Sequence, residues 1–161
     1  GEIVGYGAGM MNGYHNRPEA TAETIWRDEH GRTFLRTGDV GRFDEDGFLY
    51  ILDRKKDMIV SGGVNVFASD IEEVFIQHPD VNDVAIIAVP HEKWIETPLA
   101  LVRLRPGAAL TEDELKDWVN TRVAKHQRVN AVEFRDEDFP RNALGKVLKR
   151  QLREPYWQEQ S

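Results

Sequence analysis

The sequence predicts an α+β protein in which a β-rich N-terminal region precedes a C-terminal layer of helices packed on a small sheet. Two observations support this prediction. Residues 1–53 are rich in glycine turns and strand-like runs, whereas from residue 69 onward the apolar residues of several segments recur with a helical period. Short apolar runs typical of buried strands accompany these helical segments.

In the N-terminal region we expect strands and turns around one short helix. A strand at residues 1–4 precedes a helix over residues 17–26, which has a proline near its first turn. The strand-like segments 40–43 and 48–52 flank a glycine-containing loop at 44–47. This pattern is typical of a β-hairpin.

The dense charge run at residues 53–57 interrupts the apolar pattern, and we place the junction between two domains there. Residues 1–53 are then the β-rich end of one domain, residues 54–57 a hinge, and residues 58–161 a C-terminal α+β domain. The C-terminal domain is expected to open with two short strands around the turn Ser61–Gly63.

Two helices of the C-terminal domain carry start signals. Ser69 and Glu72 have the spacing of a capping box, and Pro79 ends the helix that follows them. Thr111 and Glu114 have the same spacing and precede a second amphipathic helix. Both helices are therefore expected to present one apolar face to a sheet.

The sheet of this domain is expected to contain strands at residues 83–89, 99–104 and 131–134. The first of these is almost wholly apolar, which predicts that it is buried on both faces. A last helix is expected to begin near Gly145 and to turn Leu152 inward.

Composition excludes several classes of function. The 161 residues are 40% hydrophobic and 30% charged, as in a folded protein, and the net charge of -7 argues against a nucleic-acid surface. The chain has no cysteine, so disulfides, thiolate zinc sites and cysteine nucleophiles are excluded. No apolar run is long enough to cross a bilayer and the N-terminus does not resemble a signal peptide, so we expect a cytoplasmic protein with no transmembrane segment.

No metal site is predicted. His91-Glu92-Lys93-Trp94 begins like a zinc-protease helix motif, but Ile95 occupies the place of the second histidine. Because the chain starts at Gly1 without methionine, we expect it to be a fragment of a longer protein.

Three positions have chemistry that suits a nucleotide or a reacting carboxylate. Asp39, expected at a strand end beside glycine, could accept hydrogen bonds from both hydroxyls of a ribose. Arg54 offers forked donors to ribose or phosphate oxygens. Lys146, expected at the tip of a loop, could bring an ammonium to a developing oxyanion. Each also fits a bland alternative: a turn aspartate, a charged linker and a solvated surface lysine.

Taken in order with Gly1–Ile3, Gly13–Thr21 and Ser61–Gly63, these segments resemble the late motifs of the adenylate-forming superfamily. This superfamily contains acyl-CoA synthetases, luciferases and the adenylation domains of peptide synthetases. The resemblance covers nearly the whole chain. It implies that residues 1–53 end the AMP-binding N-terminal domain and that residues 58–161 are the mobile C-terminal domain.

The resemblance also implies roles for individual residues. Asp39 would bind the ribose hydroxyls of ATP and AMP, and Arg54 would contact the same nucleotide. Lys56 would sit at the hinge, and Ser61, Gly62 and Gly63 would line the pantetheine tunnel in the second step. Lys146 would contact the carboxylate substrate and the α-phosphate during adenylation.

The implied reaction uses a carboxylic acid, ATP with Mg²⁺, and CoA. The superfamily's phosphate-binding loop and acyl pocket lie upstream of anything in this chain, so the sequence does not specify the acyl group. For the same reason we expect no adenylation by the chain alone. Strand edges in residues 1–53 that the missing N-terminal domain would cover are expected to associate with one another.

Two departures from the usual pattern affect the CoA side. Ile95 stands between Trp94 and Glu96, where many relatives have glycine, and residues 125–129 differ from the usual Lys-Tyr-x-x-Pro stretch. Two alternatives therefore remain beside an acyl-CoA synthetase. One is the end of a peptide-synthetase adenylation domain, which passes its acyl group to a carrier protein. The other is a truncated, non-catalytic binding module.

Overall fold

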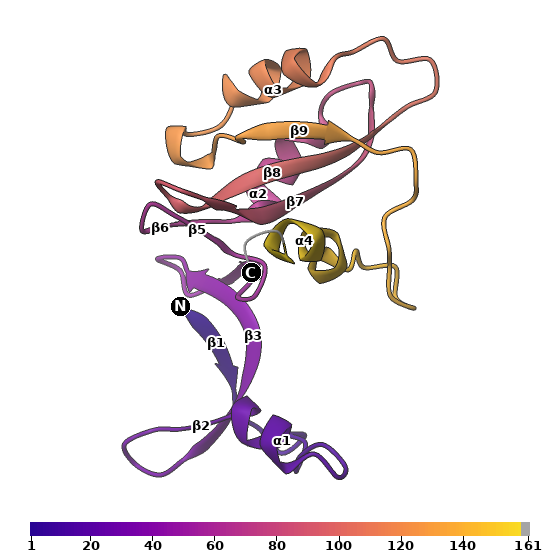
Figure 1. Ribbon diagram of the computed structural model, residues 1–161. Coiled ribbons are helices and arrows are strands. Elements are labelled where there is room, and N and C mark those ends of the chain that lie inside the picture. The colour runs from indigo at the N-terminus through magenta and orange to yellow at the C-terminus, as the bar shows by residue number, and fades with distance from the viewer. Residues whose placement is uncertain (159–161) are drawn as a thin grey trace. The chain divides into compact units, whose positions relative to one another are not determined.

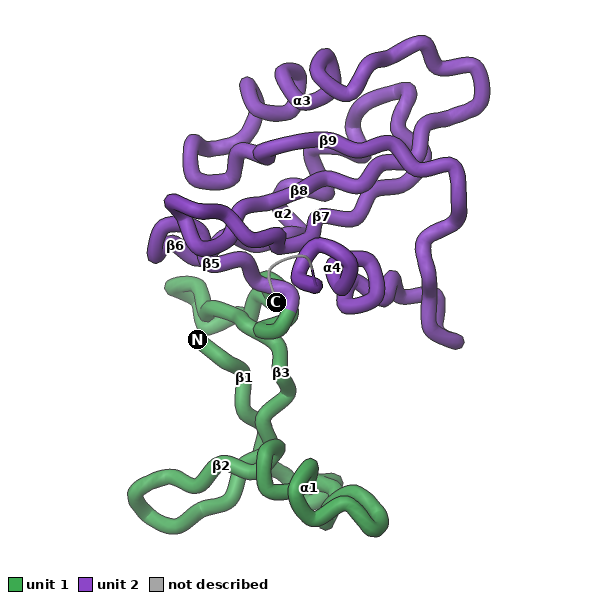
Figure 2. The backbone as a smooth tube through the Cα atoms, in the orientation of Figure 1, with its two compact units in different colours: residues 1–56 green, residues 57–161 purple. Residues whose placement is uncertain are grey.

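The computed structural model describes residues 1–158, which form two compact units, each described by itself below (Figure 2). Unit 1 comprises residues 1–56, and unit 2 begins at Asp57. Both units contain a sheet and at least one helix (Figure 1). The α+β class predicted from the sequence is therefore confirmed.

Unit 1 is a small antiparallel sheet with one helix. Its elements are β1 (Glu2–Gly5), α1 (Pro18–Thr24), β2 (Ile25–Arg27), β3 (Thr33–Phe43) and β4 (Leu49–Arg54). The long strand β3 pairs with each of the other three strands. It is therefore the strand that organises unit 1.

The predicted hairpin is confirmed as β3 and β4. In its loop the Asp44 carboxylate accepts hydrogen bonds from the backbone N–H groups of Asp46 and Phe48, at 3.0 and 2.8 Å. The hydrogen bond from Phe48 is the main cause that lowers the pKa of Asp44 below its ordinary value. These hydrogen bonds therefore stabilise the turn that the sequence predicted between the two strands.

The predicted end of the first helix is wrong. Helix α1 ends at Thr24, and Trp26 lies in β2. Ile25 already has an extended backbone, with φ −97° and ψ 132°. The pairing of Ile25 and Trp26 with β3 outweighs the helical continuation, because both residue types favour strands.

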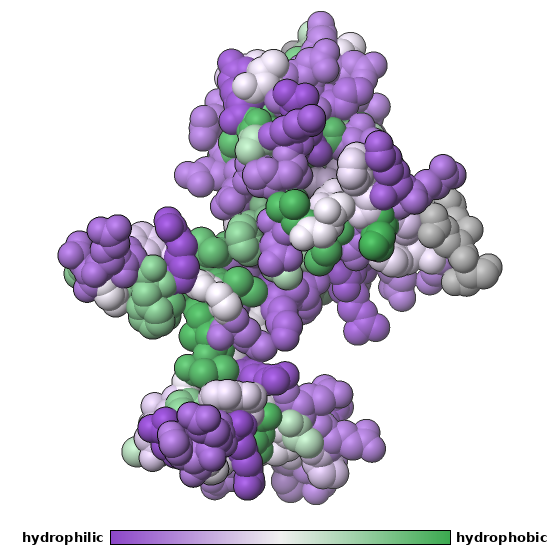
Figure 3. Space-filling view, turned by 90° about the vertical axis from the view of Figure 1, so that its left-hand side faces the viewer, coloured by the Kyte–Doolittle hydropathy of each residue, from purple (hydrophilic) through white to green (hydrophobic). Residues whose placement is uncertain are grey.

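Large apolar side chains are exposed on the β3–β4 hairpin. Phe43, Phe48 and Ile51 are 69%, 68% and 65% exposed. Figure 3 shows hydrophobic residues, in green, on the surface of the molecule. Unit 1 therefore leaves unburied a hairpin whose composition is more typical of an interface than of a free surface.

Unit 2 is a mixed sheet with helices on both faces. Its elements are β5 (Ile59–Ser61), β6 (Val64–Val66), α2 (Ala68–Ile76), β7 (Val81–His91), β8 (Ile95–Leu104), α3 (Glu112–Asn120), the 3₁₀ turn η1 (Lys125–Gln127), β9 (Ala131–Phe134) and α4 (Lys149–Gln158). Strand β8 pairs with β7 antiparallel along its whole length and with β9 parallel. The predicted strands at 83–89, 99–104 and 131–134 are confirmed within these elements.

Side chains of β7 alternate between two hydrophobic cores. Val84 and Ile86 join the core under α2 and α3, whereas Ala85 and Ile87 join the core under α4. Figure 1 shows α4 in front of the sheet and α2 behind it. Because both faces are covered, β7 is apolar almost without interruption, as the sequence indicated.

One predicted capping box is confirmed and the other is wrong. The Thr111 side chain accepts from the Glu114 N–H, and the Glu114 carboxylate accepts from the Thr111 N–H. Helix α2, in contrast, begins at Ala68 after an N-cap at Phe67 that has no side-chain hydrogen bond. Ser69 lies inside the first turn and is too late to cap it, and Glu72 has a different role that is described below.

The last helix also begins later than predicted. Helix α4 starts at Lys149 rather than near Gly145. The preceding residues form a turn in which Arg141 and Val147 face each other as an isolated β-bridge. The inward orientation of Leu152, which packs against the core under α4, is confirmed.

The first residue of β8, directly after the turn that connects it to β7, is strained. Ile95 has φ +69° and is 75% exposed. A β-branched residue is an outlier in this left-handed region. The turn is held by neighbours: Ser61 pairs with Ile95, and the Gly62 N–H donates to the Trp94 carbonyl at 3.0 Å.

Replacement of Ile95 by glycine is expected to stabilise the chain. Relief of the left-handed strain contributes roughly 1–2 kcal/mol, and the flexibility of glycine offsets roughly 0.5–1 kcal/mol of it. Urea unfolding followed by circular dichroism should therefore show a net gain of about 1 kcal/mol. The matched control is Ile76→Gly, at the exposed end of α2, which should lose stability. Equal losses in both variants would contradict the strain at Ile95.

Candidate functional site

Asp39 and Arg54, the two residues expected to contact a nucleotide, form an ion pair in unit 1. They face each other in the register of β3 and β4, and Arg54 Nε lies 2.7 Å from Asp39 Oδ1. The expectation that Asp39 ends a strand is wrong, because β3 continues to Phe43. The strand persists because β4 pairs with β3 along this stretch.

The backbone around Asp39 is fixed by two hydrogen bonds. The Asp39 N–H donates to Thr37 Oγ1 at 3.1 Å, and the Thr37 hydroxyl donates to the Ile3 carbonyl at 2.9 Å. The Asp39 and Arg54 side chains are 25% and 46% exposed. A carboxylate has about four acceptor positions and a guanidinium has five donors, so the pair retains hydrogen-bonding capacity for a polyhydroxyl ligand.

Lys56 lies at the boundary between the two units. It is the last residue of unit 1, exposed, in the turn that follows β4. The neighbouring Lys55 is tied to unit 1 by its N–H, which donates to the Gly38 carbonyl at 2.8 Å, and by its ammonium, 2.9 Å from Glu2 Oε2. The hinge role of Lys56 stays a prediction.

The Ser61-Gly62-Gly63 segment forms a tight turn between β5 and β6 in unit 2. Ser61 pairs with Val64, and both glycines have positive φ, +57° and +82°. A Cβ on Gly62 would lie 2.8 Å from Cε3 of Trp94. Glycine is therefore required at position 62 for the indole to pack on the turn.

The turn borders a cavity of about 550 Å³, here called the Trp94 cavity. The residues that line it include Ser61, Gly62, Trp94, Lys125, His126, Arg128, Val129 and Asn130. The cavity thus combines an indole, exposed backbone of a glycine turn and cationic side chains. Sequence reasoning identified the turn but missed Trp94 as its packing partner, because the indole reaches it only through the β7–β8 connection.

Lys146 lies in the exposed turn at residues 142–146 before α4, here called the Lys146 turn. Its N–H donates to Asn142 Oδ1 at 3.0 Å, and its carbonyl accepts from the Asn142 N–H at 2.9 Å. Gly145 has φ +80°, which glycine adopts without strain. Within residues 57–158 the Lys146 ammonium has no hydrogen-bond or ion-pair partner. The backbone is thus fixed while the charge stays available.

The structure does not bring Lys146 and the Ser61–Gly63 turn together. Figure 1 shows the β5–β6 turn and the segment between β9 and α4 on opposite sides of unit 2. Unit 2 therefore carries two separate candidate sites, an exposed lysine turn and a cavity lined by glycine, tryptophan and cationic side chains.

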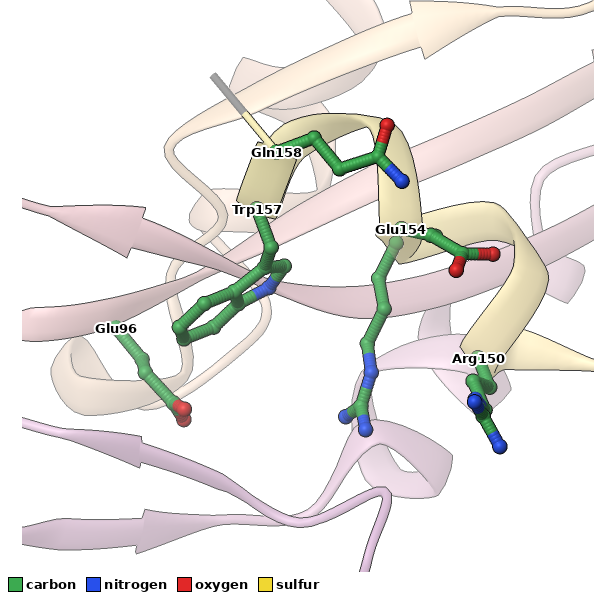
Figure 4. Close-up of a pocket in the computed structure, with 6 residues that line it drawn as sticks. Glu96, Arg150, Glu154, Trp157 and Gln158 are labelled. Atoms are coloured by element: carbon green, nitrogen blue, oxygen red, sulfur yellow. The ribbon is translucent and has the colours of Figure 1, made fainter. Parts of the chain in front are cut away.

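A second cavity, of about 440 Å³, lies beside α4 (Figure 4). Its lining residues are Glu96, Arg150, Arg153, Glu154, Trp157 and Gln158. Trp157 is held in place because its Nε1–H donates to the Ala88 carbonyl at 3.0 Å. Two arginines and two glutamates leave the lining without net charge, so the cavity itself favours no particular ion.

Neither a metal cluster nor a membrane span is found in residues 1–158. No group of three histidine, aspartate or glutamate side chains is placed to hold a metal ion there. No helix in the described part of the chain is both long and apolar enough to cross a membrane.

Residues 70–146 match the family described as the AMP-binding enzyme C-terminal domain. The chain is 45% identical over 153 residues to 2-succinylbenzoate–CoA ligase of Geobacillus kaustophilus (strain HTA426), covering 95% of this chain and 30% of the relative. It is 43% identical over 156 residues to long-chain-fatty-acid–CoA ligase FadD13 of Mycobacterium tuberculosis, covering 97% and 30%. The chain thus spans about 30% of the length of these relatives.

Two solved structures are also similar to nearly the whole of this chain. ATP-bound MatB from Rhodopseudomonas palustris has a TM-score of 0.85 and 36% identity, over 97% of this chain and 30% of that one. The o-succinylbenzoate CoA synthetase MenE from Bacillus subtilis, in complex with the acyl-adenylate intermediate OSB-AMP, has a TM-score of 0.81 and 36% identity, over 94% and 30%.

Gly62→Ala is expected to disturb the Trp94 cavity more than Gly63→Ala does. Both substitutions place alanine at positive φ, but only position 62 also meets the indole, since nothing lies within 4 Å of a Cβ at position 63. The backbone strain costs roughly 1–3 kcal/mol in each variant, and Gly62→Ala should lose more. Chemical unfolding measures both losses. In a Trp94→Ala background the two losses should become equal, and a persistent difference would contradict the proposed contact.

Proposed function

Because this chain belongs to the adenylate-forming superfamily, as the C-terminal portion of an AMP-forming ligase, we propose that its parent enzyme is an ATP-dependent acyl-CoA synthetase. The reaction converts a carboxylic acid, ATP and CoA into acyl-CoA, AMP and pyrophosphate. The observation that carries the proposal is the separation of two chemically different sites on unit 2, the Lys146 turn and the Trp94 cavity. Two such sites, presented in turn by a domain motion, suit a two-step reaction in one cleft.

In the first step the substrate carboxylate attacks the α-phosphate of MgATP, and pyrophosphate leaves. Two anions must approach each other, so positive charge near the α-phosphate lowers the barrier. Lys146 supplies an ammonium from a fixed backbone and is the adenylation lysine of this proposal. Mg²⁺ enters with ATP as part of the substrate.

Asp39 and Arg54 bind the ribose in this scheme. Arg54 Nε already orients the Asp39 carboxylate through Oδ1. The other carboxylate oxygen can accept from the ribose hydroxyls, while the terminal guanidinium nitrogens donate to ribose or phosphate oxygens. The ion pair therefore acts as a preformed clamp rather than as two independent contacts.

In the second step the C-terminal part rotates about Lys56 and replaces the Lys146 turn with the Trp94 cavity. Ser61, Gly62 and Gly63 let the backbone come close to the narrow pantetheine arm. Lys125 and Arg128, which line the cavity, carry charge opposite to that of the CoA phosphates. The thiol then attacks the acyl carbon, and AMP leaves.

Two alternatives concern the acceptor and the activity. A peptide-synthetase adenylation domain would deliver the acyl group to a carrier protein instead of CoA, and a truncated module would not react. Both relatives described above are CoA ligases, which favours CoA as the acceptor. Comparison of thioester formation with CoA and with a carrier protein distinguishes an acyl-CoA synthetase from a peptide-synthetase adenylation domain.

Lys146→Ala in the full-length parent enzyme is expected to lose about 10²–10³-fold in adenylation, the effect of one removed oxyanion donor. ATP–pyrophosphate exchange measures this step. Thioester formation from supplied acyl-AMP should be nearly unchanged, and equal losses in both steps would contradict the assignment.

The control is Lys116→Ala, which should leave both steps unchanged. Lys116 is a surface lysine of α3 that pairs with Asp113. The 161-residue chain alone should show no exchange, and robust exchange by it would contradict the dependence on an N-terminal domain.

The exposed β3–β4 hairpin is proposed to pack on the remainder of the N-terminal domain and, in its absence, to associate with other copies. Light scattering of the chain should show concentration-dependent association, and Ile51→Lys should reduce it, because Ile51 is 65% exposed. Thr33→Lys, at the far end of β3, is the control. A monomer at all concentrations would contradict this association.

A further inference from the structure

The Lys146 turn lies between two ion pairs that connect it to the rest of unit 2. Before the turn, Arg141 Nη2 lies 2.5 Å from Asp83 Oδ2 of β7. After the turn, Lys149 Nζ lies 2.7 Å from Glu72 Oε1 of α2. The turn is thus attached on both sides to elements that precede it in the chain, β7 and α2.

The first ion pair acts directly on the residue before Lys146. While Arg141 Nη2 contacts Asp83, its Nη1 donates to the Gly145 carbonyl at 2.8 Å. The Asp83 carboxylate is itself held, because Oδ1 accepts from the Val84 N–H at 3.0 Å. A planar guanidinium can bridge a carboxylate and a carbonyl at once in a fixed geometry, which an ammonium on a flexible stem does not reproduce.

The second ion pair joins three elements at one carboxylate oxygen. Glu72 Oε1 accepts from the Ile86 N–H of β7 at 2.8 Å and from the Lys149 ammonium. The Glu72 and Lys149 side chains are only 23% and 15% exposed. Because the pair is largely withdrawn from water, it is screened less than a surface ion pair and fixes the first residue of α4.

The remainder of α4 is docked at its other end through Tyr156 and Trp157, and these contacts oppose a compensating shift of the helix. The Tyr156 hydroxyl donates to Glu133 at 2.5 Å and accepts from Arg135 at 2.6 Å. Burial, with the Glu133 carboxylate, raises the pKa of Tyr156 to about 12, so the hydroxyl remains a donor even at pH 10, the ordinary pKa of tyrosine. Trp157 adds its bond to the Ala88 carbonyl.

We propose that Asp83 with Arg141 and Glu72 with Lys149 are positioning residues, which fix the Lys146 backbone so that its ammonium reaches one place in the adenylation cleft. This inference rests on the proposed role of Lys146. Displacing a reacting group by about 1 Å can cost on the order of 10²-fold in rate. Loss of one ion pair should therefore cost about tenfold to a hundredfold in adenylation and leave the thioester step intact.

The first test is made on the 161-residue chain and needs no activity. Asp83→Asn keeps the side-chain shape but removes the charge that holds Arg141. ¹⁵N relaxation of Leu144, Gly145 and Lys146 should show order parameters that fall from about 0.85 toward 0.6 or below. Asp113→Asn breaks a surface ion pair of α3 at the same 2.5 Å distance and should leave them unchanged. Unchanged order parameters in Asp83→Asn would overturn the inference.

The second test uses the full-length enzyme. Asp83→Asn and Arg141→Lys should slow adenylation and spare thioester formation from acyl-AMP. In a Lys146→Ala background the same substitutions should have no further effect, because they act through Lys146. Equal losses in both steps, or a full further loss in the Lys146→Ala background, would overturn the positioning role and indicate general destabilisation.

Failure of the proposed function and failure of the positioning role give different results. If Lys146→Ala leaves adenylation unchanged, the proposed function fails, while the order parameters still decide whether the ion pairs fix the turn. If Asp83→Asn does not fold, Glu72→Gln tests the second ion pair, with the same expected loss of order at the turn and the same selective loss of adenylation.

Discussion

The antiparallel pairing of β7 with β8 is the constraint on which unit 2 depends. It runs from Val81 to His91, and its side chains alternate between the two hydrophobic cores. A one-residue shift would exchange the two sets of side chains, so the register is strongly specified. Both candidate sites of unit 2 are positioned by this pair of strands.

The two ends of β7 lead to the two sites. Near its start, Asp83 pairs with Arg141 before the Lys146 turn, and the Ile86 N–H holds Glu72, which pairs with Lys149 after it. At its end, the His91–Ile95 connection places Trp94 against Gly62. One strand thus sets the spacing between the proposed adenylation lysine and the cavity proposed for the thiol carrier. In the proposed scheme, rotation of this unit exchanges one site for the other without refolding either.

Features that depend on neighbouring residues in sequence were predictable, and features that depend on distant partners were not. The Thr111–Glu114 capping box, the β3–β4 hairpin and the strand at 131–134 are local and are confirmed. Glu72 has the same sequence spacing from a serine as Glu114 has from a threonine. Its carboxylate, however, accepts a hydrogen bond from β7 and forms an ion pair with α4. The start of α4 was likewise misplaced, because Arg141 and Val147 form a bridge that no helical period reveals.

The candidate residues follow the same division. Asp39 and Arg54 were singled out separately from their chemistry, but their ion pair depends on the register of two strands. Ile95 was noted as a departure from the usual glycine, and its positive φ gives that departure a physical meaning. Trp94 was noted only for the residues that follow it, since its contact with Gly62 spans 32 residues of sequence.

The central claim is that unit 2 presents two different sites to two successive steps. Single-turnover measurement of both half-reactions, in Lys146→Ala and in Trp94→Ala forms of the full-length enzyme, tests it most directly. The account predicts opposite selectivity: the lysine variant loses adenylation and keeps thioester formation, and the tryptophan variant does the reverse. Loss of the same half-reaction in both variants would contradict it.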